Sequence, residues 1–286
     1  MSRIVYVNGE YAPEEAAKIS VFDRGFIFGD GVYEVVPVVA QKLVDRDYFL
    51  ERLDRSLSEV SITWPCSQRE YLDIMQELIS RNTLEEGFVY SQVTRGIADR
   101  DFVFPADTAP SLVAFTSQMN LLNNPLAESG IAVSTSEDIR WKRRDIKSVN
   151  LLAQCLAKQD AHSKGANEGW MVEDGFVTEG VTSSAYIVKE RKIITRPLSN
   201  SILPGIRRRT LIEIAERECI KLEQRLFSLE EALQADEAFI SSATTITLPV
   251  VSIDGEKIAD GIPGEITCKL RKLYIEKLLE EANNSE

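Results

Sequence analysis

Short runs typical of β-strands alternate with amphipathic helical runs along this chain, and this pattern favours a mixed fold. In the first part, 87–96 and 111–116 are rich in β-branched and aromatic residues, as strands are. In the same part, 48–62 and 69–84 repeat apolar residues at helical spacing. We therefore expect an α+β arrangement here.

A second series of the same kind follows a polar segment at 121–128, which contains two asparagines and a proline and is typical of a linker. After it, the pattern predicts a strand at 130–136, a helix at 148–163 and short strands within 169–195. It then predicts that residues 203–211 run from a turn into a helix that reaches about residue 221, and it predicts a last helix at 265–281. We expect an N-terminal domain at 1–120, the linker at 121–128 and a C-terminal domain at 129–286.

Composition argues against several classes of partner and site. The 286 residues carry a formal net charge of −12 at pH 7, which opposes binding to nucleic acid or to an anionic membrane surface. The sequence has neither a run of the roughly 20 apolar residues that span a bilayer nor an apolar N-terminal signal, so we expect a cytoplasmic protein. The single histidine, His162, and four scattered cysteines offer no pattern for a metal site.

A basic stretch at 139–152, I-R-W-K-R-R-D-I-K-S-V-N-L-L, contains the first candidate for chemistry. Cations at 140 and 142–144 precede Lys147 there. Nearby positive charge and loss of solvent favour a neutral lysine. A neutral amine is a nucleophile that forms a Schiff base with an aldehyde. The structural alternative is a solvated basic turn that leads into a helix.

Two turns and one arginine are candidates for holding a phosphate. The run L-P-G-I at 203–206 opens a helix, whose first backbone N–H groups have no intrahelical partner and attract anions. The run S-S-A-T-T at 241–245 supplies hydroxyl groups, and Arg52 can add a charged fork. Each feature alone is common for structural reasons. Together they are sufficient to surround one phosphate monoester.

Three further residues are candidates for contacts with a cofactor or a substrate. Glu179 lies at the end of a predicted strand, where a glutamate is usually exposed. A buried carboxylate that faced a pyridine nitrogen would instead keep that nitrogen protonated. Tyr33 and Arg100 carry donors that can bind a substrate carboxylate. The structural alternative is that Tyr33 is an ordinary aromatic residue of a strand, and that Arg100 is a loop arginine paired with Asp99 or Asp101.

The order of several short motifs resembles one known family. The chain contains, in this order, F-G-D-G-V-Y-E-V-V, Q-V-T-R-G, D-I-R-W, D-I-K-S-V-N-L-L, T-E-G and L-P-G-I. In these motifs, from about Val5 to the C-terminal helix, it is similar to the fold-type IV aminotransferases, which use pyridoxal 5′-phosphate (PLP), and most to the D-amino-acid transaminase branch. The resemblance implies an α/β (α+β) protein with a small N-terminal α/β domain and a larger, PLP-binding C-terminal domain with a barrel-like β core.

The resemblance also implies a role for each candidate residue. Lys147 corresponds to the lysine that holds PLP and moves the substrate proton, and Glu179 to the acid that faces the pyridine nitrogen. Arg52 corresponds to the phosphate-binding arginine, and Tyr33 and Arg100 to parts of the trap for the substrate carboxylate. The remaining cofactor contacts fall on Leu203, Ile206, Arg207, Ser242, Ala243 and Thr244. The family works as a homodimer, in which Arg100 is expected to reach the partner's active site.

Three positions depart from the pattern of the family. Phe102 stands where the D-amino-acid branch has a histidine, and Arg207 and Ala243 stand where threonine is common. Backbone N–H groups can bind a phosphate despite the last two changes. Loss of the histidine removes one donor to the substrate carboxylate, and such a hydrogen bond is worth about 1.5–3 kcal/mol. An aromatic residue at position 102 also favours apolar substrates.

We therefore expect a PLP-dependent transaminase that moves the amino group of a D-amino acid to a 2-oxo acid, 2-oxoglutarate or pyruvate, by a ping-pong mechanism. The first alternative is an (R)-selective amine:pyruvate transaminase, because of Phe102. Further alternatives are a branched-chain-type transaminase, a PLP lyase of the aminodeoxychorismate type, and a PLP-binding protein without turnover.

Overall fold

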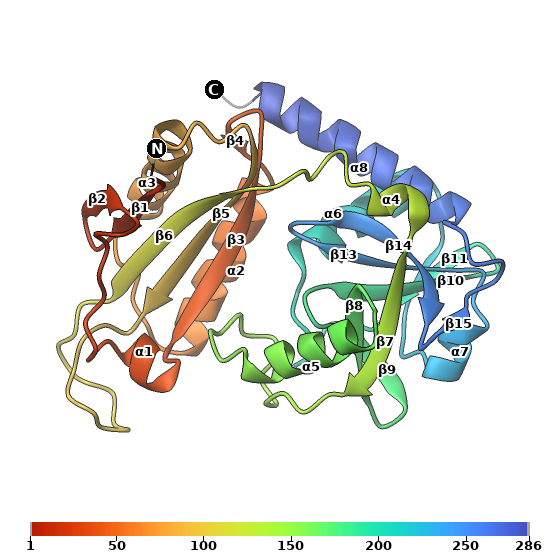
Figure 1. Ribbon diagram of the computed structural model, residues 1–286, viewed down its shortest axis with the longest axis horizontal. Coiled ribbons are helices and arrows are strands. Elements are labelled where there is room, and N and C mark those ends of the chain that lie inside the picture. The colour runs from red at the N-terminus through yellow and green to blue at the C-terminus, as the bar shows by residue number, and fades with distance from the viewer. Residues whose placement is uncertain (1, 285–286) are drawn as a thin grey trace. The chain divides into compact units, whose positions relative to one another are not determined.

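The computed structural model describes residues 2–284, and its contacts divide the chain into two compact units (Figure 1). Unit 1 contains the described residues of Met1–Asn120, Ile146–Asn150 and Leu278–Glu286, and unit 2 contains Leu121–Asp145 and Leu151–Lys277. The short piece Ile146–Asn150 thus belongs to unit 1, although the chain on both sides of it belongs to unit 2. The expected domain boundaries stay a prediction.

Unit 1 is built on a six-stranded sheet whose neighbouring strands all pair antiparallel. The strand order is β2 (Glu10–Pro13), β1 (Ile4–Val7), β6 (Ser111–Gln118), β5 (Glu86–Thr94), β3 (Gly31–Val39) and β4 (Lys42–Leu43). Alternate residues along β5 are buried, as expected for a sheet that is covered on one face. Strands β3 and β5 pair along their whole length, and β3 carries Tyr33 and Glu34.

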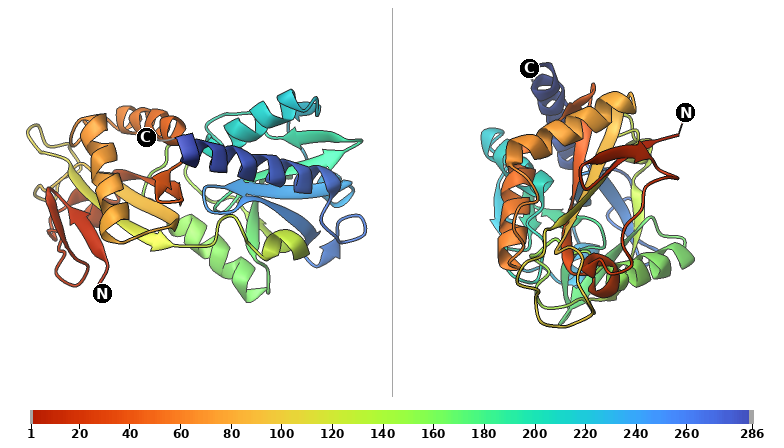
Figure 2. Two further views of the ribbon diagram at one scale, coloured as in Figure 1. Left: turned by 90° about the horizontal axis from the view of Figure 1, so that it is seen from above. Right: turned by 90° about the vertical axis from the view of Figure 1, so that its left-hand side faces the viewer.

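Three helices complete unit 1. Helix α2 (Arg46–Glu59) contacts β3, and α3 (Gln68–Arg81) contacts β1 and β6, so both pack against the sheet (Figure 2). Their apolar positions are buried at helical spacing, which confirms the two helices predicted in this part. The short helix α1 (Arg24–Phe28) begins where Asp23 accepts a hydrogen bond from the N–H of Gly25, and it ends at Gly29 in the left-handed conformation.

Unit 2 is built on a nine-stranded mixed sheet. The strand order is β12 (Leu222–Gln224), β11 (Lys192–Thr195), β10 (Ser184–Lys189), β13 (Glu237–Ser242), β14 (Ile246–Ile253), β7 (Ile131–Glu137), β8 (Glu168–Glu173) and β9 (Phe176–Gly180), and β15 (Glu256–Lys257) pairs with β14. Buried apolar residues from seven of these strands form the core of the unit, together with Phe227, whose ring contacts that of Trp170. The sheet is strongly curled (Figure 1), as expected for a barrel-like core.

The helices of unit 2 lie around this sheet. They are α4 (Leu126–Ser129), α5 (Leu152–Ser163), α6 (Ile206–Arg217), α7 (Leu229–Leu233) and α8 (Glu265–Asn284), whose last residues are counted with unit 1. Helix α6 is shorter than predicted, because Cys219 adopts a positive φ of 55° that an α-helix cannot contain. Within the described residues, no helix is both long and apolar enough to cross a membrane.

The start of α5 differs from the sequence-based prediction. The helix was expected from residue 148, but it begins at Leu152. The preceding segment Ile146–Asn150 instead forms hydrogen bonds with the beginning of β3, and the N–H of Val149 donates to the carbonyl of Gly31 at 3.1 Å. Backbone groups bonded to a strand cannot also bond within a helix. The end of the helix was predicted correctly, since Gly165 follows it with a φ of 76°.

Candidate active site

Lys147 lies in the segment Ile146–Asn150, which runs beside the first residues of β3 in unit 1. The N–H of Tyr33 donates to the carbonyl of Lys147 at 3.0 Å, so the backbone positions these two residues together. Lys147 is half-buried, and its Nζ lies 4.2 Å from the centroid of the Tyr33 ring. The structural alternative, a solvated basic turn that leads straight into a helix, is therefore wrong. The structure brings together two predicted site residues, Lys147 and Tyr33.

The positive charge that precedes Lys147 in the sequence is compensated in the fold. The pairs are Arg140 with Asp138 and Glu179, Arg143 with Asp145, and Arg144 with Asp138 and Glu173, at 2.6–3.3 Å. Opposite charges at such distances largely cancel the field of each arginine. Sequence reasoning treated these cations as surrounding Lys147, and it did not foresee the carboxylates that pair with them. Three of the four cations fold into a network of their own in unit 2.

Arg52 is fixed by a buried carboxylate on the central strand of unit 1. Its Nε and Nη2 donate to the two oxygens of Glu34 at 2.9 and 2.6 Å. Glu34 is fully buried and Arg52 is 8% exposed, and a two-point contact of this kind sets the plane of the guanidinium. Glu34 follows Tyr33 in β3, so the two side chains leave opposite faces of the strand. Sequence reasoning assigned no role to Glu34, although it stands inside the motif that contains Tyr33.

Arg100 and Phe102 lie together in an exposed loop of unit 1. The guanidinium carbon of Arg100 is 5.5 Å from the ring centroids of both Phe28 and Phe102, which are themselves 5.5 Å apart. Within the described part of the chain, Arg100 forms no ion pair with Asp99 or Asp101. In a single chain, the structure thus groups Arg100 with Phe102 and Phe28, whereas Tyr33 is grouped with Lys147.

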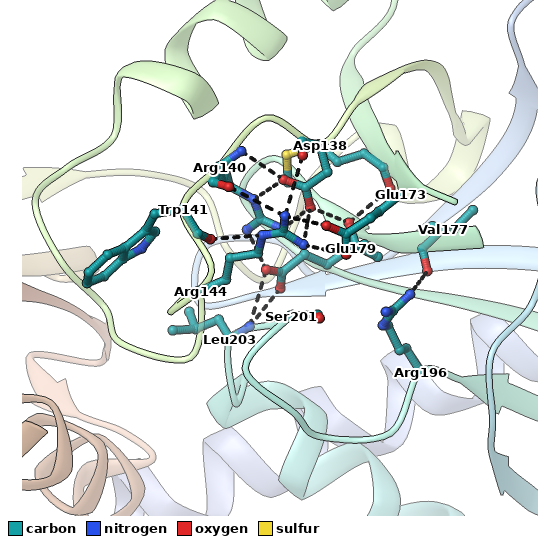
Figure 3. A network of polar contacts seen from close by, with 12 residues as sticks. Asp138, Arg140, Trp141, Arg144, Glu173, Val177, Glu179, Arg196, Ser201 and Leu203 are labelled. Atoms are coloured by element: carbon teal, nitrogen blue, oxygen red, sulfur yellow. Dashed lines mark hydrogen bonds and ion pairs between the residues drawn. The ribbon is translucent and has the colours of Figure 1, made fainter. Parts of the chain in front are cut away.

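Glu179 lies near the end of β9 in unit 2 and is buried (Figure 3). Its Oε1 accepts a hydrogen bond of 2.6 Å from Nη1 of Arg140, and the N–H of Leu203 donates to both carboxylate oxygens at 3.2 Å. Burial raises the pKa of Glu179 above its ordinary value, and Arg140 and the N–H of Leu203 oppose that shift without cancelling it. The structural alternative, in which Glu179 is exposed to solvent, is wrong. The structure brings Glu179 and Leu203 together.

Arg140 is held in turn by Asp138 (Figure 3). Its Nε and Nη2 donate to the two oxygens of Asp138 at 2.9 and 2.7 Å, and the hydroxyl of Thr178 donates to the same carboxylate at 2.7 Å. Burial alone would raise the pKa of Asp138, but the contacts with Arg140 and Thr178 lower it overall. Asp138 therefore orients Arg140, and Arg140 in turn orients the Glu179 carboxylate. The motif D-I-R-W contains both Asp138 and Arg140, so the sequence held a signal for this arrangement.

The first turn of α6 is open to an anion. Gly205 precedes the helix, and no side chain caps its N-terminus. The N–H groups at 206–208 therefore lack intrahelical acceptors and carry the positive end of the helix dipole. The side chain of Arg207 is buried, and its Nη2 donates to the carbonyl of Ala243 at 3.1 Å while its guanidinium lies over the Tyr274 ring. The arginine that replaces the usual threonine thus contacts the hydroxyl-rich turn.

The turn between β13 and β14 gathers hydroxyl groups beside that helix. The hydroxyl of Ser242 lies 3.4 Å from that of Thr244 and 2.9 Å from that of Thr245. Among residues 2–284, the N–H groups of Ala243 and Thr244 have no hydrogen-bond acceptor. Unpaired N–H groups, hydroxyls and an uncapped helix start form a site that suits a phosphate. The structure therefore brings together the predicted residues at 206, 207 and 242–244.

These groups fit PLP in kind. Unit 1 supplies an amine, Lys147, beside an aromatic ring. Unit 2 supplies a buried carboxylate, Glu179, and a cradle of N–H groups and hydroxyls that suits an anion. An aldehyde, a pyridine nitrogen and a phosphate are the matching groups on the cofactor.

Comparison with known proteins points the same way. A sequence profile of the family described as amino-transferase class IV matches residues 31–253. A D-alanine aminotransferase of Staphylococcus haemolyticus is 39% identical over 269 residues, which cover 94% of this chain and 95% of that protein. The solved branched-chain amino acid aminotransferase of Escherichia coli has a TM-score of 0.90 at 22% identity, covering 100% of this chain and 97% of that chain. The corresponding enzyme of Thermobaculum terrenum, solved in its PLP-form, has a TM-score of 0.85 at 21% identity, covering 99% and 97%. The expected fold class is confirmed.

Proposed function

The chain belongs to the class IV aminotransferase family, and from this premise we propose that it transfers the amino group of a D-amino acid to a 2-oxo acid. It is a PLP-dependent transaminase, and 2-oxoglutarate and pyruvate are the acceptors we expect, used in a ping-pong mechanism. One observation of the structure supports the proposal most directly: the Lys147 amine lies over the ring of Tyr33, so a nucleophile lies beside a residue of β3 whose hydroxyl can bind a substrate carboxylate.

Lys147 is the proposed catalytic residue. Its amine would bind the cofactor covalently. Once the substrate amine has displaced it, Lys147 would take the proton from the substrate Cα and deliver that proton to the cofactor. PLP, when bound, supplies the electron sink that makes this Cα–H bond acidic. The half-buried position of Lys147 limits its contact with water, which suits one group that acts as both base and acid. The hydroxyl of Tyr33 would bind the substrate carboxylate.

The cofactor contacts are proposed residue by residue. Glu179, fixed by Arg140, would face the pyridine nitrogen, and Leu203 would pack against the ring. Arg52, oriented by Glu34, would contact the phosphate. The phosphate cradle would consist of Ile206, Arg207, Ser242, Ala243 and Thr244.

We also propose that the chain works as a homodimer in which Arg100 and Phe102 reach the partner's active site. The loop that carries them exposes large apolar side chains, and Phe102 and Val103 are 77% and 73% exposed. Phe26 on α1 is 76% exposed. Exposed aromatic groups of this size are typical of protein interfaces. The loop is nevertheless well anchored, because the buried Arg24 donates to the carbonyl of Asp101 at 2.6 Å.

The direct test uses the purified holoenzyme with D-alanine and 2-oxoglutarate. We expect pyruvate to form, and D-alanine alone should convert the cofactor spectrum to that of its amine form. L-alanine is the control for stereochemistry, and Lys147→Ala is the control for the catalytic lysine. Absence of both pyruvate and the spectral change with D-alanine would refute the proposed donor.

Phe102 motivates a second candidate function. A phenyl ring beside Arg100 removes one donor from the carboxylate trap and adds an apolar surface. The candidate is an (R)-selective amine:pyruvate transaminase. The same spectral assay with (R)-1-phenylethylamine tests it, and an unchanged cofactor spectrum would rule it out.

A further inference from the structure

The turn at Ser242–Thr245 is followed by a residue in an unusual backbone conformation. Ile246 has a φ of 59° and is fully buried. A β-branched side chain in the left-handed region is a genuine outlier, because its Cβ approaches the backbone closely. Such strain persists only where the surrounding structure holds it, and it is typical of functional sites. A specific contact should therefore hold the chain at Ile246.

Arg271 makes that contact. Its Nη1 donates to the carbonyl of Thr245 and to the carbonyl of Thr247, both at 2.8 Å, so one nitrogen bonds the carbonyls of the two residues on either side of Ile246. Its Nη2 donates to the carbonyls of Leu121 and Leu122 at 3.0 and 3.1 Å. Arg271 is 8% exposed and projects from the long helix α8. Two charge-assisted hydrogen bonds therefore connect α8 to the chain on either side of Ile246, and two more connect α8 to Leu121 and Leu122.

A second arginine acts on the same turn from the side of α6. Arg207 donates to the carbonyl of Ala243, and its guanidinium lies 4.8 Å from the ring centroid of Tyr274, which is one helical turn after Arg271 on α8. In a trans peptide the C=O and the following N–H point in opposite directions. A carbonyl of Ala243 directed at Arg207 therefore directs the N–H of Thr244 away from the arginine, where an anion can accept it.

The charges around the turn have the sign that a phosphate requires. The four hydrogen-bond acceptors described above for Arg271 are all neutral backbone carbonyls, so they do not neutralise its charge. Burial and the neighbouring Arg207 cation lower the pKa of Arg271, which indicates that the two positive charges act on each other. A bound phosphate would relieve this repulsion.

We propose that Arg271 is a positioning residue for the cofactor phosphate, which holds the turn Ser242–Thr245 in its binding shape by bonding the two carbonyls on either side of the strained Ile246. It does not touch the cofactor. This inference rests on the proposed function, because it assumes that the turn holds the phosphate of PLP. The chemistry of the reaction at Lys147 does not enter into it.

The test compares two ligands, PLP and pyridoxal, which lacks the phosphate. Apoprotein is titrated with each, and the ratio of the two dissociation constants measures how well the phosphate is recognised. In Arg271→Met we expect the dissociation constant of PLP to rise about tenfold, because the turn relaxes from its strained shape and phosphate binding must restore that shape. The dissociation constant of pyridoxal should stay unchanged. Arg95→Met is the matched control, since Arg95 is also buried and also donates to backbone carbonyls, but to those of Ser61 and Val60 in unit 1.

Ile246→Gly tests whether phosphate recognition can be restored without Arg271. No such restoration is expected if Arg271 contributes only to stability. Glycine adopts a positive φ without strain, so the turn keeps its shape without Arg271. We expect the double variant Arg271→Met/Ile246→Gly to unfold at a lower temperature than Arg271→Met, because a buried side chain is lost, yet to regain recognition of the phosphate. If Arg271→Met fails to fold, Arg271→Lys replaces it, since a lysine keeps the charge but cannot reach four carbonyls.

The outcomes separate this inference from the proposed function. If the wild-type protein binds pyridoxal as tightly as PLP, the turn is not a phosphate site, and the proposed function loses its cofactor cradle. If the wild type distinguishes the two ligands and Arg271→Met distinguishes them equally well, the proposed function stands and the role of Arg271 is refuted. Equal weakening of PLP and pyridoxal, or a double variant with no regained recognition, also refutes that role.

Discussion

At the scale of single residues, the Glu179 carboxyl makes the stability of the apoprotein depend on pH. Its pKa is raised in the fold, chiefly by burial, above the unfolded value of about 4.3. The folded state then binds the proton more tightly than the unfolded state does. The stabilisation is therefore complete below pH ~4.3 and is lost as the pH rises through the folded pKa.

The variant Glu179→Gln isolates this effect, because glutamine has the same shape but does not titrate. We expect the unfolding free energy of the wild-type apoprotein, relative to that of the variant, to decrease between pH ~4 and the raised pKa. Urea unfolding at a series of pH values measures both proteins. Parallel curves for the two proteins over this range would contradict the prediction. PLP is left out, because a pyridinium facing Glu179 would favour the carboxylate.

Phe102 leads to a second prediction at this scale. Phe102→His restores a donor beside Arg100, and a hydrogen bond to a charged group is worth about 1.5–3 kcal/mol, so kcat/KM for D-alanine should rise about 10- to 150-fold. Turnover of (R)-1-phenylethylamine should fall or stay absent. Phe102→Leu is the control, since leucine is apolar but lacks a donor. An equal rise in both variants would show that ring size, and not the donor, limits the reaction.

At the scale of elements, the placement of Lys147 depends on Asn150 and the end of α1. The amide of Asn150 donates to the carbonyl of Gly29 at 2.9 Å, and a Cβ on Gly29 would lie 2.5 Å from the side-chain oxygen of Asn150. Gly29 and Gly165 both have a left-handed φ, of 66° and 76°, but a Cβ on Gly165 would meet nothing within 4 Å. The two glycines are therefore a matched pair.

We expect Gly29→Ala and Gly165→Ala to lose a similar amount of unfolding free energy, about 1–2 kcal/mol, from backbone strain. Only Gly29→Ala also displaces Asn150, and with it the segment that carries Lys147. It should therefore have a lower kcat and a slower reaction of apoprotein with PLP. Chemical unfolding and stopped-flow absorbance measure the two effects. Equal activity in the two variants would show that the Asn150 contact does not position Lys147.

The elements also show what the sequence could reveal. Local periodicity was sufficient to predict α2 and α3, and Gly165 marked the end of α5. The start of α5 was missed because Ile146–Asn150 bonds to β3, more than a hundred residues away in the sequence. A helical pattern contains no information about such a pairing.

The site shows the same limit. Motifs made Lys147 and Glu179 candidates for the site, but the residues that position the candidate site were not recognised. Glu34 acts on a residue 18 positions away, and Arg271 acts on carbonyls 24 to 150 positions away. Only the fold reveals such contacts, because they follow from packing and not from local spacing.

At the scale of the whole molecule, the proposed dimer makes each active site depend on two chains. If Arg100 serves the partner's site, a chain with Lys147→Ala still supplies a functional Arg100, and a chain with Arg100→Ala still supplies a functional Lys147. A heterodimer of the two then contains one complete site, assembled from the intact residue of each chain. If Arg100 serves its own chain, neither site of the heterodimer is complete.

Each variant should be nearly inactive alone. After the two are unfolded together and refolded in equal amounts, random pairing should give about half heterodimers, and therefore about a quarter of the wild-type activity. The activity of the mixture and its sedimentation mass measure assembly and function separately. The exposed Val103 provides a further control, since Val103→Asp places a charge in the apolar loop and should prevent both dimer formation and complementation. A mixture that sediments as a dimer but gains no activity would place Arg100 in its own chain's site or outside both sites.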